Sequence, residues 1–76
     1  MTKLKERRLI EGLSQSELAE KSGVSFRMIQ QYEQGQQPMD KAEIGTILRL
    51  SVALGCAVYD ILETDELVAL AVELNN

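Results

Sequence analysis

The chain has 76 residues, 45% of them hydrophobic, with three aromatic residues, one proline, one cysteine and no histidine. A chain of this length has a marginal core, so we expect a single domain over residues 1–76 in which every helix contributes an apolar face. Without histidine or a partner for Cys56, the sequence lacks the residues for a disulfide, a zinc cluster or nucleophile–base catalysis. We therefore expect no cofactor and no enzymatic activity, and we interpret Cys56 as a small buried apolar residue.

Charge and hydropathy limit where the protein can be located and which partners it can bind. No apolar run approaches the ~20 residues that span a bilayer, and the charged start does not resemble a signal peptide, so we expect a cytoplasmic protein without membrane contact. The net charge of −4 argues against nucleic acid, because phosphate neutralisation needs lysine and arginine. However, all eight basic residues lie in the first 49 positions, whereas residues 51–76 hold five acids and no base. A local basic surface opposite an acidic C-terminal part is compatible with specific DNA binding.

The first predicted helix covers residues 3–11 and ends at Gly12. We expect Leu4 and either Leu9 or Ile10 to face the core. The helix also carries four of the eight basic residues, namely Lys3, Lys5, Arg7 and Arg8. The two lysines fit a solvated charged face as well as they fit a contact with DNA phosphate.

Residues 14–35 read as two short helices that meet at a glycine. Ser14 is placed to cap the first helix, and Glu17 three residues later completes a capping box. Gly23 suits the left-handed conformation that follows a helix C-terminus, and Ser25 then caps the second helix. A turn this short does not let the helices lie antiparallel. The stretch therefore predicts a helix-turn-helix that crosses at a steep angle.

Residues 13–35 follow the pattern L-S-Q-x-E-L-A-x-x-S-G-V-S-x-x-x-I-x-x-Y-E-x-G, which resembles the phage-repressor and Cro-type (Xre-like) helix-turn-helix family. The match is specific because physically distinct positions agree, including a glutamine that opens the first helix and the inward-facing Val24 and Ile29. The resemblance implies an all-α, compact five-helix repressor-like DNA-binding domain, to which this chain adds a C-terminal helix. It also implies double-stranded DNA as the partner.

The resemblance implies roles for three further positions. In the family, an arginine at the place of Arg8 pairs with the glutamate near the end of the recognition helix, here Glu33, and ties the first helix to the third. Such a pair orients more than it stabilises, because desolvation offsets much of the Coulomb gain. A glutamine at the place of Gln15 holds a DNA phosphate and braces the recognition helix, at a helix start that favours anions. Arg7 is then left free to meet a phosphate.

Residues 26–34 form the expected recognition helix. Its angular positions turn Ile29 and Tyr32 inward. The side chains left to contact DNA, together with the cap, are Ser25, Phe26, Arg27, Gln30, Gln31 and Gln34. Arginine can bind guanine, glutamine can bind adenine, and phenylalanine can touch a thymine methyl group. Glutamine is also an ordinary helix-surface residue and Phe26 can simply cover the turn, but the crowding of glutamines in residues 30–37 favours base readout.

Two helices are predicted after the loop. Asp40 and Glu43 repeat a capping pattern for a fourth helix that runs to about Leu54. Its apolar residues form one broad face: Ile44, Ile47, Leu48, Leu50, Val52 and Leu54. A short fifth helix over residues 58–62 follows, and because Ala57 stands at its cap we expect it to fray readily.

A C-terminal helix is expected over residues 64–74, where acidic residues after Thr64 suit the helix dipole and leucines recur at helical spacing. Its apolar face either folds back on the core of its own domain or meets a second copy of the chain across a two-fold axis. We favour a homodimer, because two recognition helices related by a dyad read half-sites about one helical turn apart. The surface expected to pair consists of Val58, Ile61, Leu67, Leu70 and Leu74.

The main functional prediction is a sequence-specific transcriptional regulator, a repressor that reads the major groove with residues 26–34. The alternative is an antitoxin, in which the C-terminal helix binds a toxin partner while the same domain represses its own operon. The sequence contains nothing that separates the two.

Overall fold

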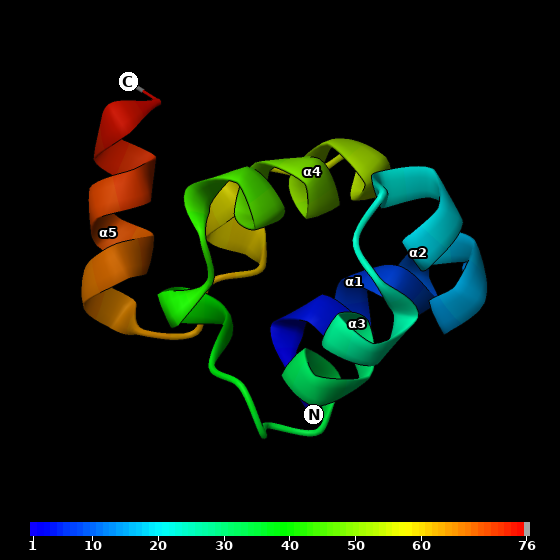
Figure 1. Ribbon diagram of the computed structural model, residues 1–76. Helices are drawn as coiled ribbons and strands as arrows, with labels where there is room; N and C mark the ends of the chain where they lie inside the picture. Colours follow the sequence, from blue (N-terminus) through cyan, green and yellow to red (C-terminus); the bar gives the residue numbers. More distant parts are fainter. Residues whose placement is uncertain (76) are drawn as a thin grey trace.

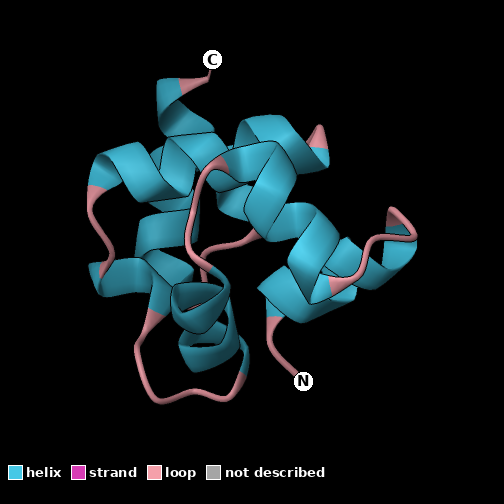
Figure 2. Ribbon diagram, turned by 45° about the vertical axis from the view of Figure 1, so that its right-hand side comes forward, coloured by secondary structure: helices cyan, strands magenta, loops and turns pink. Residues whose placement is uncertain are grey.

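The computed structural model describes residues 1–75, which form five α-helices and two 3₁₀ turns joined by short loops (Figure 1). In chain order the elements are α1 (Lys3–Ile10), α2 (Gln15–Ser22), α3 (Phe26–Glu33), η1 (Met39–Lys41), α4 (Ile44–Leu54), η2 (Val58–Asp60) and α5 (Asp65–Leu74). No strand occurs in this part of the chain (Figure 2). The predicted all-α class is confirmed.

The predicted helix-turn-helix is formed by α2 and α3. Ser14 Oγ accepts a hydrogen bond from the Glu17 amide (3.0 Å), and the Ser14 amide donates to the Glu17 carboxylate (2.9 Å), which completes the capping box. The bonds from the Ser14 amide and hydroxyl hold the pKa of Glu17 below its usual value. Gly23 ends α2 with a left-handed φ of 76°, and Ser25 Oγ accepts the Met28 amide (3.1 Å) to start α3. Local capping chemistry therefore sets both ends of the turn.

The core draws on each of the first four helices. Its most deeply buried side chains are Leu4, Leu18, Ile29, Leu50, Leu54 and Ile61. The inward face predicted for α1 was partly wrong, because Leu9 and Ile10 are exposed and Arg8 takes the buried position one turn after Leu4. Leu4 and Arg8 share a face because they are four residues apart. Leu9 and Ile10 follow Arg8 by about 100° and 200° of helical rotation, which turns them toward solvent.

The broad apolar face predicted for α4 divides into two opposite faces. Ile47, Leu50 and Leu54 are buried in the core. Ile44, Leu48 and Val52 follow one another at four-residue spacing and are exposed. The sequence could not separate the two sets, because apolar residues surround this helix on most sides.

The cap predicted for α4 was also wrong. The helix starts at Ile44 after Glu43, and no side chain caps it. Asp40 instead lies in η1 and accepts hydrogen bonds from the amides of Glu63 (2.7 Å) and Thr64 (2.6 Å) and from the Thr64 hydroxyl. Asp40 therefore attaches the loop after α3 to the start of α5.

The fifth predicted helix is reduced to the single turn η2. The Ala57 amide donates to the Asp60 carboxylate (2.9 Å), but alanine offers no side-chain acceptor in return. Ile61 and Leu62, which directly follow the turn, are both buried in the core. A cap that lacks its acceptor and two consecutive inward side chains both favour a short turn over a regular helix.

The C-terminal helix α5 packs partly on its own domain. Leu67, Val68 and Ala71 lie against the core, whereas Leu70 and Leu74 are exposed. The pairing surface predicted from the sequence needs correction, because Ile61 is completely buried, and Val58 and Leu67 are half-buried against the same core. Of that surface, only Leu70 and Leu74 remain available to a partner.

Candidate nucleic-acid interface

The outer side of α3 collects the side chains predicted to read DNA. Ile29 and Tyr32 are buried, so α3 is fixed by one face. At 100° per residue, the opposite face spans an arc of about 140°. It holds Phe26, Arg27, Gln30, Gln31 and Gln34, of which the two central glutamines are half-buried and the others exposed. One arginine, three amides and one aromatic ring therefore lie side by side on an exposed helix, and all three types can recognise base edges.

Ser25 precedes this arc and is exposed. Its Oγ caps α3 by accepting the Met28 amide. The hydroxyl proton is not used in that bond, so Ser25 can still donate to a phosphate oxygen. The capping role and the predicted DNA contact are therefore chemically compatible.

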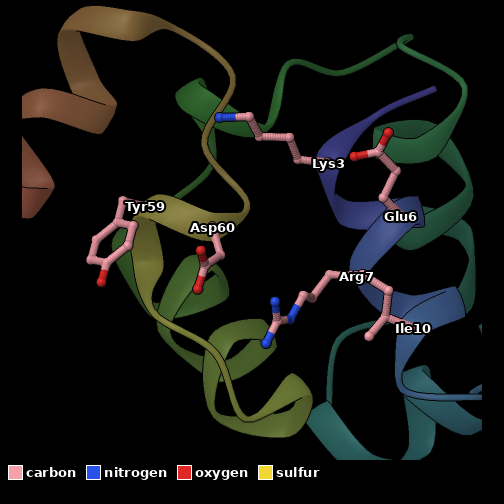
Figure 3. A pocket seen from close by; sticks show the side chains of 6 residues that line it. All are labelled: Lys3, Glu6, Arg7, Ile10, Tyr59 and Asp60. Atoms are coloured by element: carbon pink, nitrogen blue, oxygen red, sulfur yellow. The ribbon is translucent and has the colours of Figure 1, made fainter.

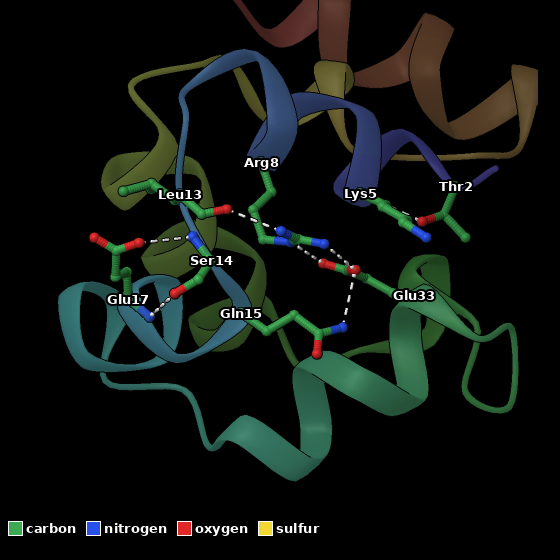
Figure 4. Close-up of polar contacts among 8 residues, drawn as sticks. All are labelled: Thr2, Lys5, Arg8, Leu13, Ser14, Gln15, Glu17 and Glu33. Carbon is green, nitrogen blue, oxygen red and sulfur yellow. Dashed lines mark hydrogen bonds and ion pairs between the residues drawn. The ribbon is translucent and has the colours of Figure 1, made fainter.

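The position of α3 is fixed by an ion pair with α1 (Figure 4). Arg8 Nε lies 2.7 Å from Glu33 Oε2, and Arg8 Nη2 donates to Glu33 Oε1 at 2.9 Å. The Arg8 and Glu33 side chains are only 9% and 2% exposed. The hydrogen bond and the charge of Glu33 raise the pKa of Arg8, although burial acts in the opposite direction. This bidentate geometry defines the orientation of α3 as well as its distance from α1.

Gln15 joins the same network from the first turn of α2. Its Nε2 donates to Glu33 Oε1 at 3.1 Å, so it braces the recognition helix as the resemblance implies. A primary amide carries two N–H donors, and only one is directed at Glu33. The second donor, together with the α2 backbone amides, remains available for a DNA phosphate.

One contact in this network was not anticipated from the sequence. Arg8 Nη1 donates to the main-chain oxygen of Leu13 at 2.8 Å (Figure 4). Leu13 lies directly before the α2 cap, so Arg8 holds the loop between α1 and α2 as well as α3. The sequence carries no signal for this bond, since any residue supplies a carbonyl oxygen.

Arg7 lies on another side of α1. It lines a hollow of about 220 Å³ between α1 and η2, near Tyr59 and Asp60 (Figure 3). The Arg7 Nε is buried. Burial and the Asp60 charge raise the pKa of the half-buried Cys56 thiol, and the nearby Arg7 charge opposes them. This placement directs Arg7 toward η2 and does not support the phosphate contact predicted for it.

A basic residue without a predicted role lies beside α3. Lys41 of η1 is exposed and borders a hollow of about 340 Å³ whose wall includes Met28, Tyr32 and Thr46. Burial, and secondarily the charge of Glu43, raises the pKa of Tyr32. Lys41 lies a few residues after α3 in the chain. This short distance along the sequence was the only indication that Lys41 could contact DNA.

The acidic part of the chain lies elsewhere. α5 carries Asp65, Glu66 and Glu73 and no basic residue. Figure 1 places α5 and α2 on opposite sides of the molecule. The acids that would repel a phosphate backbone are therefore separated from the helix-turn-helix.

Residues 1–75 contain no group of three or more side chains arranged to hold a metal ion. Over the same residues, no helix is both long enough and apolar enough to cross a membrane.

Comparison with known proteins agrees with this geometry. A family model described as helix-turn-helix matches residues 4–61. The chain matches no curated protein and no solved structure. The family match covers the elements from α1 to η2 and ends before α5. The C-terminal helix is thus an addition to the matched pattern.

Proposed function

Because the chain belongs to the Xre/Cro-type helix-turn-helix family and is a DNA-binding regulator, we propose that it is a sequence-specific repressor that reads the major groove with α3. The main support for this proposal is that hydrogen bonds fix the position of α3, while the side chains that can contact bases lie on its solvent-facing side. Arg8, Glu33 and Gln15 fix α3 from one side. The face of α3 opposite the buried Ile29 and Tyr32 carries Arg27, Gln30, Gln31 and Gln34, whose side chains can each bind a base edge through two hydrogen bonds.

The proposed contacts divide into two classes. Arg27 and the glutamines of α3 discriminate between bases, with Phe26 placed to touch a thymine methyl group. Gln15 and Ser25 hold phosphates at the starts of α2 and α3, which sets the register without reading sequence. We add Lys41 to the phosphate class because it is exposed close to α3. We leave Arg7 out of this class, because its side chain lines the hollow between α1 and η2.

The repressor is proposed to act as a homodimer in the cytoplasm. A single helix of the length of α3 contacts only a few base pairs, whereas two copies related by a dyad read palindromic half-sites 10–10.5 base pairs apart. Repression then follows from occupancy of an operator that overlaps a promoter. No catalytic step is assigned to the chain.

Selection of binding sites from a pool of random duplexes tests this function. The full chain should enrich a palindrome whose half-sites are separated by about one helical turn. An Arg27→Ala/Gln31→Ala variant, selected in parallel, should lose the enrichment at the positions that these residues read. Recovery of random sequence by the wild-type chain would contradict the proposal.

A further inference from the structure

The outward face of α4 is apolar although no other part of the described chain covers it. Ile44, Leu48 and Val52 are 67%, 47% and 80% exposed. They follow one another at four-residue spacing, so they form one continuous stripe along the helix. On the other side of α4, Ile47, Leu50 and Leu54 are buried in the core. Figure 1 shows α4 at the edge of the molecule, with α1, α2 and α3 below it.

Two further residues, one small and one charged, lie on the same face of α4 as the apolar stripe. Gly45 and Arg49 fall within an arc of about 140° that also contains the apolar stripe. A Cβ built on Gly45 would meet no atom within 4 Å. Gly45, in the first turn of α4, therefore leaves open space on this face. Arg49 gives the α4 face a positive charge.

The same chain carries, on α5, a surface whose charge is opposite to that of the α4 face. Leu70 and Leu74 of α5 are exposed, and Glu66 and Glu73 lie within about 100° of them around the helix. This edge of α5 is therefore apolar and acidic, where the face of α4 is apolar and basic. In Figure 1 the C-terminal end of α5 projects beyond α4, and Leu70 and Leu74 near that end are 50% and 88% exposed.

We infer that the outward face of α4 is the surface through which two copies of this chain pair, with the α5 edge of each copy packed beside α4 of the other. With a two-fold axis between the facing α4 helices, the α5 edge of each copy packs beside α4 of the other copy. Both copies therefore use the same surface, and the contact is self-complementary. The proposal rests on the dimer of the proposed function and names its interface. It replaces the surface predicted around Ile61, because Ile61 is buried in the core.

The arrangement of the exposed apolar side chains favours a second copy over a bare surface. Five large aliphatic side chains on α4 and α5 are about half exposed or more. Three of them form the stripe on α4, and the other two lie on the outward edge of α5. Apolar residues scattered singly are normal on a soluble monomer, whereas aliphatic side chains aligned along one helix are typical of an interaction site. The opposite charges of Arg49 and of the two glutamates add specificity, since a wrongly oriented copy would bring acid against acid.

Sedimentation velocity of the full chain without DNA tests the pairing. The wild-type chain should dimerise, and Leu48→Gln/Val52→Gln should raise the dimer Kd at least tenfold while circular dichroism stays unchanged. The matched control is Leu9→Gln/Ile10→Gln, which removes two exposed aliphatic side chains from α1. It should leave the Kd within twofold. A wild-type chain that is monomeric at millimolar concentration, or equal effects of the two double variants, would overturn the inference.

Charge reversal tests the orientation of the two copies. Arg49→Glu alone and Glu66→Arg/Glu73→Arg alone should each weaken the dimer, and the chain that carries all three changes should recover most of the wild-type Kd. Additive weakening would overturn the arrangement of α5 beside α4. Binding to a duplex with one half-site separates this inference from the proposed function. If Leu48→Gln/Val52→Gln loses dimers but binds one half-site normally, the interface is supported, whereas failure of the wild-type chain on every duplex contradicts only the function.

Discussion

Arg8 and Glu33 are joined by two hydrogen bonds of 2.7 and 2.9 Å, so the first helix holds the recognition helix through a bidentate ion pair. Arg8→Met or Glu33→Gln should each lower the free energy of unfolding by about 3 kcal/mol, because each leaves a buried charge without its partner. The double variant Arg8→Met/Glu33→Gln should lose clearly less than the sum of the two. Urea denaturation of the four proteins measures this cycle, and additive losses would show that the two residues do not interact.

Gln15 should affect binding more than folding. Gln15→Ala removes one hydrogen bond to Glu33, which predicts a loss of about 1–2 kcal/mol of stability. It should weaken binding to every duplex by the same factor, since a phosphate contact carries no base information. Titration of an operator and of a scrambled duplex measures both factors. A loss confined to the operator would assign Gln15 to base readout.

Lys41 and Arg7 should behave differently although both are cationic. Lys41→Ala should weaken binding to all duplexes and reduce the slope of log K against log salt by about 1, as loss of one phosphate contact requires. Arg7→Ala should change DNA affinity less than twofold, because Arg7 lies beside Asp60 and η2. A salt titration of both variants checks this pair of expectations. A lower salt slope for Arg7→Ala would restore Arg7 to the DNA surface.

Asp40 should make the attachment of α5 sensitive to acid. Burial acts to raise the pKa of Asp40, but the bonds from Thr64 and from the Glu63 amide, aided by the Lys3 charge, outweigh it and lower the pKa. A carboxylate with a depressed folded pKa contributes stability above its unfolded pKa of about 3.9. That contribution is lost as the pH falls through the folded value.

Hydrogen exchange of the α5 amides between pH 6 and pH 3 measures this attachment. After correction for the intrinsic exchange rate, protection of α5 in the wild-type chain should fall toward the acidic end. Asp40→Asn should lower protection at pH 6 and remove most of the pH dependence. Asp65→Asn is the control, because it removes a carboxylate at the start of α5 without touching the three bonds to Asp40. A pH profile in Asp40→Asn identical to that of the wild type would contradict the assignment.

The elements set by local chemistry could be predicted from the sequence. Ser14 and Glu17 cap α2 within four residues of each other, and Gly23 ends that helix by its backbone freedom, so no distant contact was needed. The Arg8–Glu33 pair spans 25 residues. It was expected only through the resemblance to a known family.

Features that depend on packing could not be predicted in this way. Asp40 fits a capping pattern, but its carboxylate binds Thr64, 24 residues further along the chain. A side chain that can cap locally can equally accept from any backbone amide brought near it. The direction of Arg7 depends on how α1 is rotated in the domain, and only the buried positions of Leu4 and Arg8 fix that rotation.

One comparison of two duplexes checks the claim that the outer face of α3 reads base sequence. Dissociation constants for the selected operator and for a scrambled duplex are measured with the wild-type chain, Arg27→Ala and Gln31→Ala under the same salt. Each substitution should reduce discrimination between the duplexes by about 1–3 kcal/mol and leave affinity for the scrambled duplex nearly unchanged. Equal affinity of all three proteins for both duplexes would contradict the claim.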